Sequence, residues 1–251
     1  MNLFDHSKGQ YFHIDDARIY FEEAGDPEGA PLLLLHGGLG TITDFNDILE
    51  HLPMKYRFIG IDFRGHGRST IGSESLSFER YQADVEAILD HLNISDFSIL
   101  GFSDGGIVGY RLAAKTPSRV KKLMTLGAQW RLDEEDPSLS FLSTLTSEMW
   151  TEMFPESVVD YEKVNPQPDF DALVKAVAKL WTDMGSTGYP GETVRNIEAP
   201  TLIVRGDDDH LLSLTEAVEL KSRLENVSFS NIPFSGHTAH LESPVVFSHS
   251  I

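Results

Sequence analysis

The sequence predicts an α/β fold: a mostly parallel, eight-stranded sheet with helices on both faces and an inserted helical cap. Two observations predict it. Short, continuous apolar runs, as buried parallel strands require, alternate with segments of helical periodicity along most of the chain. The length of 251 residues also suits one undivided α/β domain. We therefore expect a core formed by residues 1–127 and 199–251, interrupted by residues 128–198, which do not follow this alternation.

The expected elements follow in chain order. Alternating apolar and polar residues in 11–14 and 18–22 predict two antiparallel strands joined by a tight turn. Ser77 suits the N-cap of a helix in which Tyr81, Val85 and Ile88 recur at helical spacing. Six more strands are predicted at about 32–35, 57–62, 97–101, 121–126, 201–205 and 227–232, with helices at 43–52, 77–92, 105–116 and 214–224.

Ser103 is the candidate nucleophile. It lies in a G-x-S-x-G sequence, between Gly101 and Gly105, where a predicted strand meets a predicted helix. On such a sharp turn the hydroxyl is raised above the sheet edge, and the small flanking residues let the turn close. Backbone N–H groups at the start of the helix can also stabilise a developing negative charge. The motif alone is weak evidence for a nucleophile, because a serine between glycines often only forms a turn. The predicted strand and helix on either side of it strengthen the assignment.

Three other polar loops follow predicted strands. The glycine-rich loop 36–40 allows a ligand to approach the backbone closely. Asp207, Asp208 and Asp209 follow the strand at 201–205, and His237 follows the last predicted strand. Since ligands bind beyond the carboxyl ends of parallel strands, these loops are expected to meet in one site. Their order along the chain is Ser, Asp, His.

This arrangement resembles the α/β-hydrolase superfamily, whose triad runs Ser, acid, His with each member on a loop after a strand. Residues 61–69 are similar to the D-x-R-G-x-G-x-S segment of that superfamily. The resemblance covers roughly residues 10–127 and 199–245. Four motifs in the expected order are far more specific than any one of them.

The resemblance assigns catalytic roles to three side chains. Ser103 would attack a carbonyl carbon, and His237 would take its proton, because an imidazole titrates near neutral pH. Asp209 fits the G-x-x-D spacing of the superfamily and would hold the imidazole in the required tautomer. Asp208 is the alternative acid, and His240 is the competing histidine.

The resemblance also places two oxyanion donors and two bracing histidines. The backbone N–H groups of Gly38 and Asp104 would form the oxyanion hole. His36 and His66 belong to loop motifs that usually brace the site rather than react.

Residues 128–198 depart from the alternation of strands and helices and look like the cap that this superfamily inserts after its sixth core strand. The three tryptophans of the chain, Trp130, Trp150 and Trp181, all lie in this segment. Most of their surface is expected to hold the cap together, and some of it, with Phe102, is expected to line the substrate pocket. Helical stretches are predicted at 139–154, 157–164 and 169–184.

The charge of the protein restricts the molecules that it is expected to bind. The net charge is −19, which argues against nucleic acid and anionic membranes. Residues 128–198 carry fourteen acidic and five basic side chains, which disfavours strongly anionic substrates such as coenzyme A thioesters. Residues 1–10 lack an apolar stretch, and no run approaches the ~20 apolar residues of a membrane span, so a cytoplasmic location is expected.

Cofactors and metals are not implied by the sequence. It has neither G-x-x-x-x-G-K-[ST] nor G-x-G-x-x-G, and the absence of cysteine excludes disulfides and thiolate metal sites. The run 207–210 is acidic, but adjacent carboxylates seldom point the same way, so no metal site is expected there.

The sequence therefore predicts a cofactor-free serine hydrolase that cleaves small neutral carboxylic esters through an acyl-enzyme. One alternative is a carbon–carbon bond hydrolase that uses the same triad, and another is a ligand receptor of this fold with little or no turnover. A serine nucleophile argues against dehalogenases and epoxide hydrolases of the fold, which use aspartate. Asp104 and Leu39 stand where proline iminopeptidases have Trp and Pro. The partner is expected to be a small molecule, and the protein a monomer or homodimer, with a short closing segment at 245–251.

Overall fold

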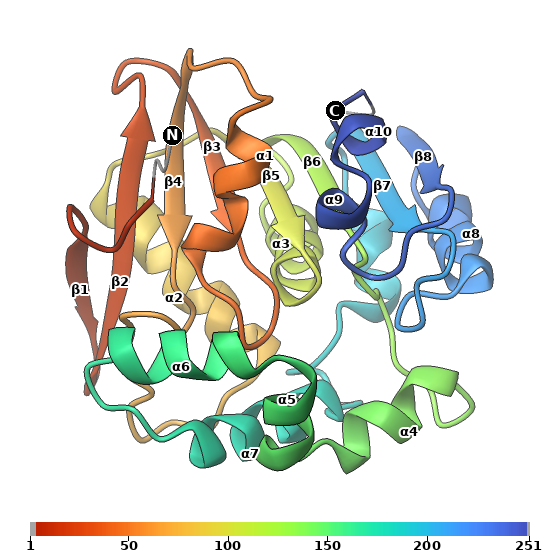
Figure 1. Cartoon of the computed structure of the whole chain (residues 1–251). Helices are drawn as coiled ribbons and strands as arrows, with labels where there is room; N and C mark the ends of the chain where they lie inside the picture. Colours follow the sequence, from red (N-terminus) through yellow and green to blue (C-terminus); the bar gives the residue numbers. More distant parts are fainter. Residues whose placement is uncertain (1–3, 250–251) are drawn as a thin grey trace.

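A single mixed sheet organises the molecule. In the computed structural model, which describes residues 4–249, eight strands lie in the order β1-β2-β4-β3-β5-β6-β7-β8 (Figure 1). Strand β2 runs antiparallel to β1 and β4, and the remaining pairs are parallel, which confirms the predicted mostly parallel sheet. The strands are β1 (Gln10–Ile14), β2 (Ala17–Gly25), β3 (Ala30–Leu35), β4 (Tyr56–Ile61), β5 (Phe97–Phe102), β6 (Val120–Leu126), β7 (Thr201–Gly206) and β8 (Val227–Ile232).

Helices cover both faces of the sheet, because the central strands are apolar on both sides. Leu33 and Leu35 of β3 belong to one buried cluster, and Leu32 and Leu34 belong to another. Helices α2, α3 and α8 lie on the first face and α1, α9 and α10 on the second (Figure 1). Their bounds are α1 (Asn46–Leu49), preceded by the 3-10 helix η1 (Ile42–Phe45), α2 (Phe78–His91), α3 (Asp104–Lys115), α8 (Leu214–Arg223), α9 (Ala239–Glu242) and α10 (Pro244–Ser248).

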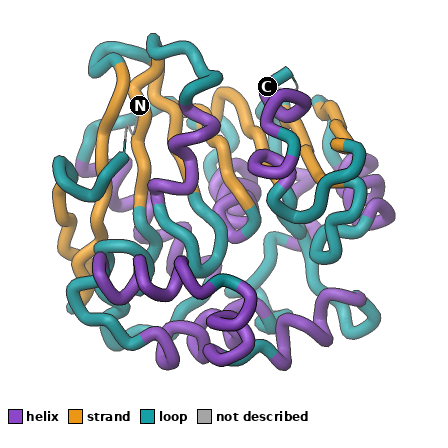
Figure 2. The backbone as a smooth tube through the Cα atoms, viewed as in Figure 1, coloured by secondary structure: helices purple, strands orange, loops and turns teal. Residues whose placement is uncertain are grey.

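The segment between β6 and β7 lies beyond the carboxyl ends of the parallel strands (Figure 1). Residues 128–198, all of which the structure describes, form helices joined by loops and contain no strand (Figure 2). We call them the insertion. Its helices are α4 (Pro137–Thr144), α5 (Ser147–Met153), α6 (Pro155–Val164), α7 (Phe170–Trp181) and the 3-10 helix η2 (Gly191–Asn196).

The helical stretch predicted at 139–154 is wrong in one respect, because it is two helices. The backbone is extended at Leu145, and Thr146 begins α5 by accepting a hydrogen bond from the N–H of Met149. A threonine side chain that caps a helix competes with continuation of the helix before it. The break turns α5 against α6 and α7 instead of prolonging α4.

Candidate active site

Ser103 lies on a strained turn between β5 and α3. Its φ of 50° and ψ of −116° fall in a region that side chains rarely adopt. The turn closes only because its neighbours are glycines. A Cβ at Gly101 would lie 2.4 Å from the carbonyl oxygen of Gly105, and one at Gly105 would lie 1.9 Å from that of Leu35. The G-x-S-x-G spacing thus has a steric cause.

Three predicted side chains form one chain of hydrogen bonds. Nε2 of His237 lies 3.0 Å from Oγ of Ser103, and its Nδ1 lies 3.0 and 3.1 Å from the two carboxylate oxygens of Asp209. Because a carboxylate only accepts hydrogen bonds, Nδ1 carries the ring proton and Nε2 is left to accept one from the serine hydroxyl. The loops after β5, β7 and β8 place these residues, which are 106 and 28 positions apart in the sequence.

Asp209 is the acid that meets His237. Burial raises the pKa of this carboxyl, but the hydrogen bond and charge of His237, with the N–H groups of Leu211 and Leu212, outweigh burial and hold the pKa below its usual value. Asp208, the alternative from sequence, is exposed. Asp207 accepts a hydrogen bond from the side chain of Asn231 instead. The side chains of these three adjacent aspartates therefore lie in three different surroundings.

Gly38 and Asp104 lie next to one another beside Ser103. A Cβ at Gly38 would lie 2.7 Å from Oδ2 of Asp104 and 2.4 Å from Cζ2 of Trp181, so only glycine fits. Asp104 is the first residue of α3, where backbone N–H groups have no partner within the helix. Its carboxyl is buried, which raises its pKa to about 7, although Trp181 and His237 both act to lower it.

A family model covers more than half of the chain. Residues 30–184 match the model of a family described as the alpha/beta hydrolase fold. The chain belongs to the α/β-hydrolase family. It is 28% identical to the serine hydrolase BPHL of Mus musculus over 91% of this chain and 79% of that protein. It is 25% identical to a 3-hydroxybutyrate-oligomer hydrolase of Cupriavidus necator over 90% and 89%. A meta-cleavage product hydrolase of Pseudomonas fluorescens has the same fold, with a TM-score of 0.79 at 18% identity, covering 98% and 96% of the two chains.

Two of the four predicted pocket residues of this α/β-hydrolase lie beside His237 or Asp104. The ring of Phe102 is 5.1 Å from that of His237, and Nε1 of Trp181 donates to both carboxyl oxygens of Asp104 at 2.8 and 3.0 Å. Sequence reasoning treated Asp104 only as a backbone donor and missed this side-chain contact. No local pattern could have revealed it, since the two residues are 77 positions apart.

The other two tryptophans have different surroundings. Trp130 donates from Nε1 to the carbonyl of Glu216 in α8 at 3.2 Å, and the guanidinium of Arg223 lies 4.2 Å from its ring centre. It follows β6 closely and meets α8 as the chain leaves the core, so its ring holds the insertion to the core. Trp150 joins α5 to α6 through a 3.0 Å hydrogen bond to Ser157.

The remaining histidines support loops of the α/β-hydrolase core. His36 donates from Nδ1 to the carbonyl of Gly37 and accepts from the N–H of Phe63. Burial lowers the pKa of His36, lowers that of His66 to about 3 and lowers that of His240 to about 4, so all three rings are neutral at pH 7. Within residues 4–249, Nε2 of His66 and Nδ1 of His240 are buried without a hydrogen-bond partner.

Two other features, a membrane-spanning helix and a metal-binding cluster, are absent from residues 4–249. No helix in that range is long and apolar enough to cross a membrane. The same part of the chain holds no cluster of three or more histidine, aspartate or glutamate side chains arranged to bind a metal.

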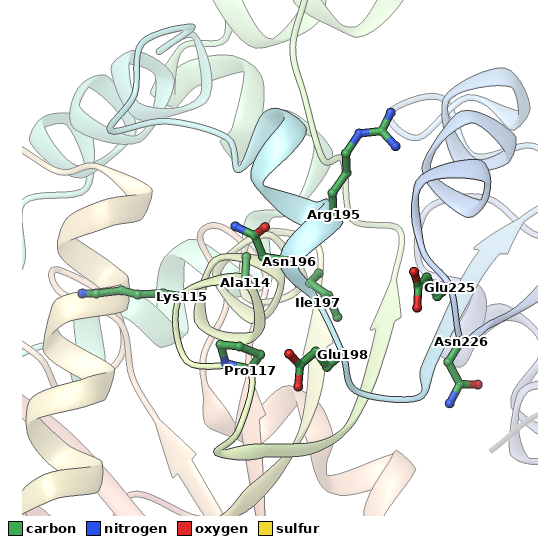
Figure 3. A pocket seen from close by; sticks show the side chains of 9 residues that line it. All are labelled: Ala114, Lys115, Pro117, Arg195, Asn196, Ile197, Glu198, Glu225 and Asn226. Atoms are coloured by element: carbon green, nitrogen blue, oxygen red, sulfur yellow. The ribbon is translucent and has the colours of Figure 1, made fainter.

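A shallow hollow lies at the end of α3 opposite Ser103 (Figure 3). The last residues of α3, η2 and the turn before β8 line it. Its two cations are already paired, Lys115 with Glu86 at 2.9 Å and Arg195 with Glu192 at 2.6 Å. Because of its position and these pairs, we assign the hollow no part in the chemistry of Ser103.

Proposed function

We propose that this α/β-hydrolase cleaves small, neutral carboxylic esters without a cofactor, through an acyl-enzyme on Ser103. The observation that carries the proposal is the unbroken chain of hydrogen bonds from Asp209 through His237 to Ser103. A nucleophile, a base and a group that orients the base are the parts that nucleophilic acyl transfer requires.

Each step of the reaction uses one of these groups. Oγ of Ser103 attacks the ester carbonyl while Nε2 of His237 takes its proton, and the tetrahedral intermediate then expels the alcohol, which receives that proton. A water molecule attacks the acyl-enzyme, again losing a proton to Nε2, and Ser103 leaves with that proton as the carboxylic acid forms. Asp209 keeps Nδ1 protonated and stabilises the imidazolium in both halves.

The oxyanion of the tetrahedral intermediate is the charge that has to be stabilised. The backbone N–H groups of Gly38 and Asp104 are the proposed donors, and each is worth about 3 kcal/mol in the transition state. The helix dipole of α3 adds positive potential at the same point. These groups are held by the backbone, so they need no reorganisation during the reaction.

The choice of small, neutral esters rests on the surroundings of the site. Phe102 and Trp181 offer apolar surface beside the proposed nucleophile, while the carboxyl of Asp104 and the acidic insertion disfavour anionic acyl groups. In this proposal residues 128–198 act as the cap over the site and residues 1–127 and 199–251 as its core. The names of two relatives, serine hydrolase and 3-hydroxybutyrate-oligomer hydrolase, support the same reaction class.

The test is turnover of p-nitrophenyl acetate and butyrate by the wild type and Ser103→Ala, with fluorophosphonate labelling and peptide mapping. We expect turnover in the wild type, loss of it in Ser103→Ala, and label on Ser103 alone. Ser228→Ala is the matched control, because Ser228 is an exposed serine on β8, and it should keep both turnover and label.

Two other outcomes would replace the proposal. Label on Ser103 without ester turnover would favour a carbon–carbon bond hydrolase that uses the same three side chains. A folded protein that takes up no label and returns its ligands unchanged would be a receptor.

A further inference from the structure

Trp181 is the point at which the insertion touches the proposed oxyanion site. It is the last residue of α7, and its indole edge lies over Gly38, so closely that a Cβ there would be 2.4 Å from Cζ2. Its Nε1–H group faces both carboxyl oxygens of Asp104, at 2.8 and 3.0 Å. The hydroxyl of Tyr189 donates to the carbonyl of Trp181 at 2.9 Å and holds the end of α7 in place.

The carboxyl of Asp104 is a potential competitor for the oxyanion donors. It belongs to the first residue of α3, and short acidic side chains at helix starts readily accept hydrogen bonds from unpaired backbone N–H groups. Its Oδ2 also lies against Gly38, the other proposed donor. A free carboxylate here could occupy the place of the substrate oxyanion, because both are anionic oxygen acceptors.

We infer that Trp181 is a positioning residue, whose indole N–H group engages the carboxyl of Asp104 and so keeps the backbone donors of Gly38 and Asp104 open for the substrate. The inference rests on the proposed function and adds a role for the insertion in it. Trp181 takes no part in bond making. It acts through Asp104, because its N–H group engages the carboxyl oxygens, which would otherwise turn toward the backbone N–H groups.

The groups around Asp104 make the competition dependent on pH. The titratable groups that face it are His237 from the loop after β8, Tyr81 from α2 and Tyr189 from the loop after α7. Burial raises the pKa of both tyrosines well above 10, so they stay neutral. With the pKa of Asp104 raised to about 7, its carboxyl changes charge within the range in which activity is measured. The ionised form is the stronger acceptor.

The decisive variant is Trp181→Phe, which keeps an aromatic ring over Gly38 and removes the N–H group. If the freed carboxylate fills the site nine-tenths of the time, kcat/KM for p-nitrophenyl butyrate falls about tenfold. The loss should be larger at pH 8, where more of Asp104 is ionised, than at pH 6. Trp181→Phe/Asp104→Ala should then recover several-fold over Trp181→Phe, because the competing carboxyl is gone.

The control is Tyr189→Phe, which removes a hydrogen bond to the same residue but leaves the indole N–H group of Trp181 in place. Any loss of activity there should be equal at pH 6 and pH 8. A purely structural role for Trp181 would make the double variant no more active than Trp181→Phe, or give a loss that does not change with pH, and either result overturns the inference.

A measurement on the wild type covers the case in which Trp181→Phe does not fold. The ¹⁵N signal of the Trp181 indole should shift between pH 6 and pH 8 as Asp104 ionises, and Asp104→Ala should abolish that shift. An indole signal that is insensitive to pH would overturn the inference. Fluorophosphonate labelling of wild-type Ser103 separates the two proposals, since its failure contradicts the serine mechanism and its success leaves the role of Trp181 to these variants.

Discussion

Gly38 is a residue at which one methyl group would change the site. The Cβ of Gly38→Ala would meet Cζ2 of Trp181 at 2.4 Å and Oδ2 of Asp104 at 2.7 Å, so either these side chains or the loop that carries the proposed oxyanion donor has to move. We expect kcat/KM to fall about 100-fold, the effect of losing one oxyanion donor. Steady-state kinetics measure it. Gly109→Ala is the control in α3, because its Cβ would lie 3.2 Å or more from side chains alone, and near-normal activity is expected.

The charge of the Asp209 carboxylate is a second feature that a single substitution can test. Asp209→Asn keeps the size of the side chain but no longer fixes the proton on Nδ1 of His237, so we expect kcat to fall by about 10³ to 10⁴-fold. Asp208→Asn, one position earlier and exposed, makes the same chemical change and should retain activity. The opposite ranking of the two variants in a kinetic assay would make Asp208 the acid.

Elements distant from Ser103 are joined by specific polar contacts, and the segment before β1 gives one example. Nε2 of His6 lies 2.9 Å from Oδ2 of Asp62, whose Oδ1 accepts the N–H group of Ile42 and whose Oδ2 accepts that of Arg68. Burial alone would lower the pKa of His6, but the hydrogen bond and charge of Asp62 outweigh it and raise the pKa above 6.5. The contact between His6 and Asp62 is therefore stronger when the His6 ring is protonated.

The pH dependence of stability follows from that raised pKa. A group whose pKa rises on folding stabilises the folded state fully below its unfolded pKa, about 6.5, and loses that effect as pH climbs through the folded value. His6→Gln should thus lower Tm most at pH 5 to 6 and least at pH 9. His13→Gln, an exposed histidine on β1, should show no such trend in the same thermal scans.

Asn165 connects the end of α6 to the core. Its Nδ2 donates to the carbonyls of Gly65, Gly67 and Ser69 at 2.9 to 3.2 Å, and it is buried. Asn165→Ala would leave these acceptors unpaired, so we expect the free energy of unfolding to fall by about 1–3 kcal/mol. Urea denaturation measures this. An equal loss in Asn196→Ala, whose side chain is exposed, would contradict the assignment.

Viewed as a whole molecule, the features that sequence could predict are those with a local cause. Apolar runs marked the central strands because β3 is buried on both faces, and G-x-S-x-G marked Ser103 because the turn admits only glycine beside it. The break between α4 and α5 depends on a single cap, Thr146, and was missed. Trp130 and Trp181 were treated alike from sequence, and only the path of the chain sends one to α8 and the other to Asp104.

Contacts that fasten the insertion to the core include those of Asn165 with the loop 65–69, of Trp130 with α8, and of Trp181 with Asp104. Of these three, the contact of Trp181 adjoins the proposed nucleophile. A movement of α7 away from the core would therefore also separate Trp181 from the carboxyl of Asp104 beside Gly38. If substrate enters by such a movement, entry and catalysis cannot take place at the same time. Ser103 would then not react with any molecule too large for α7 to return over it.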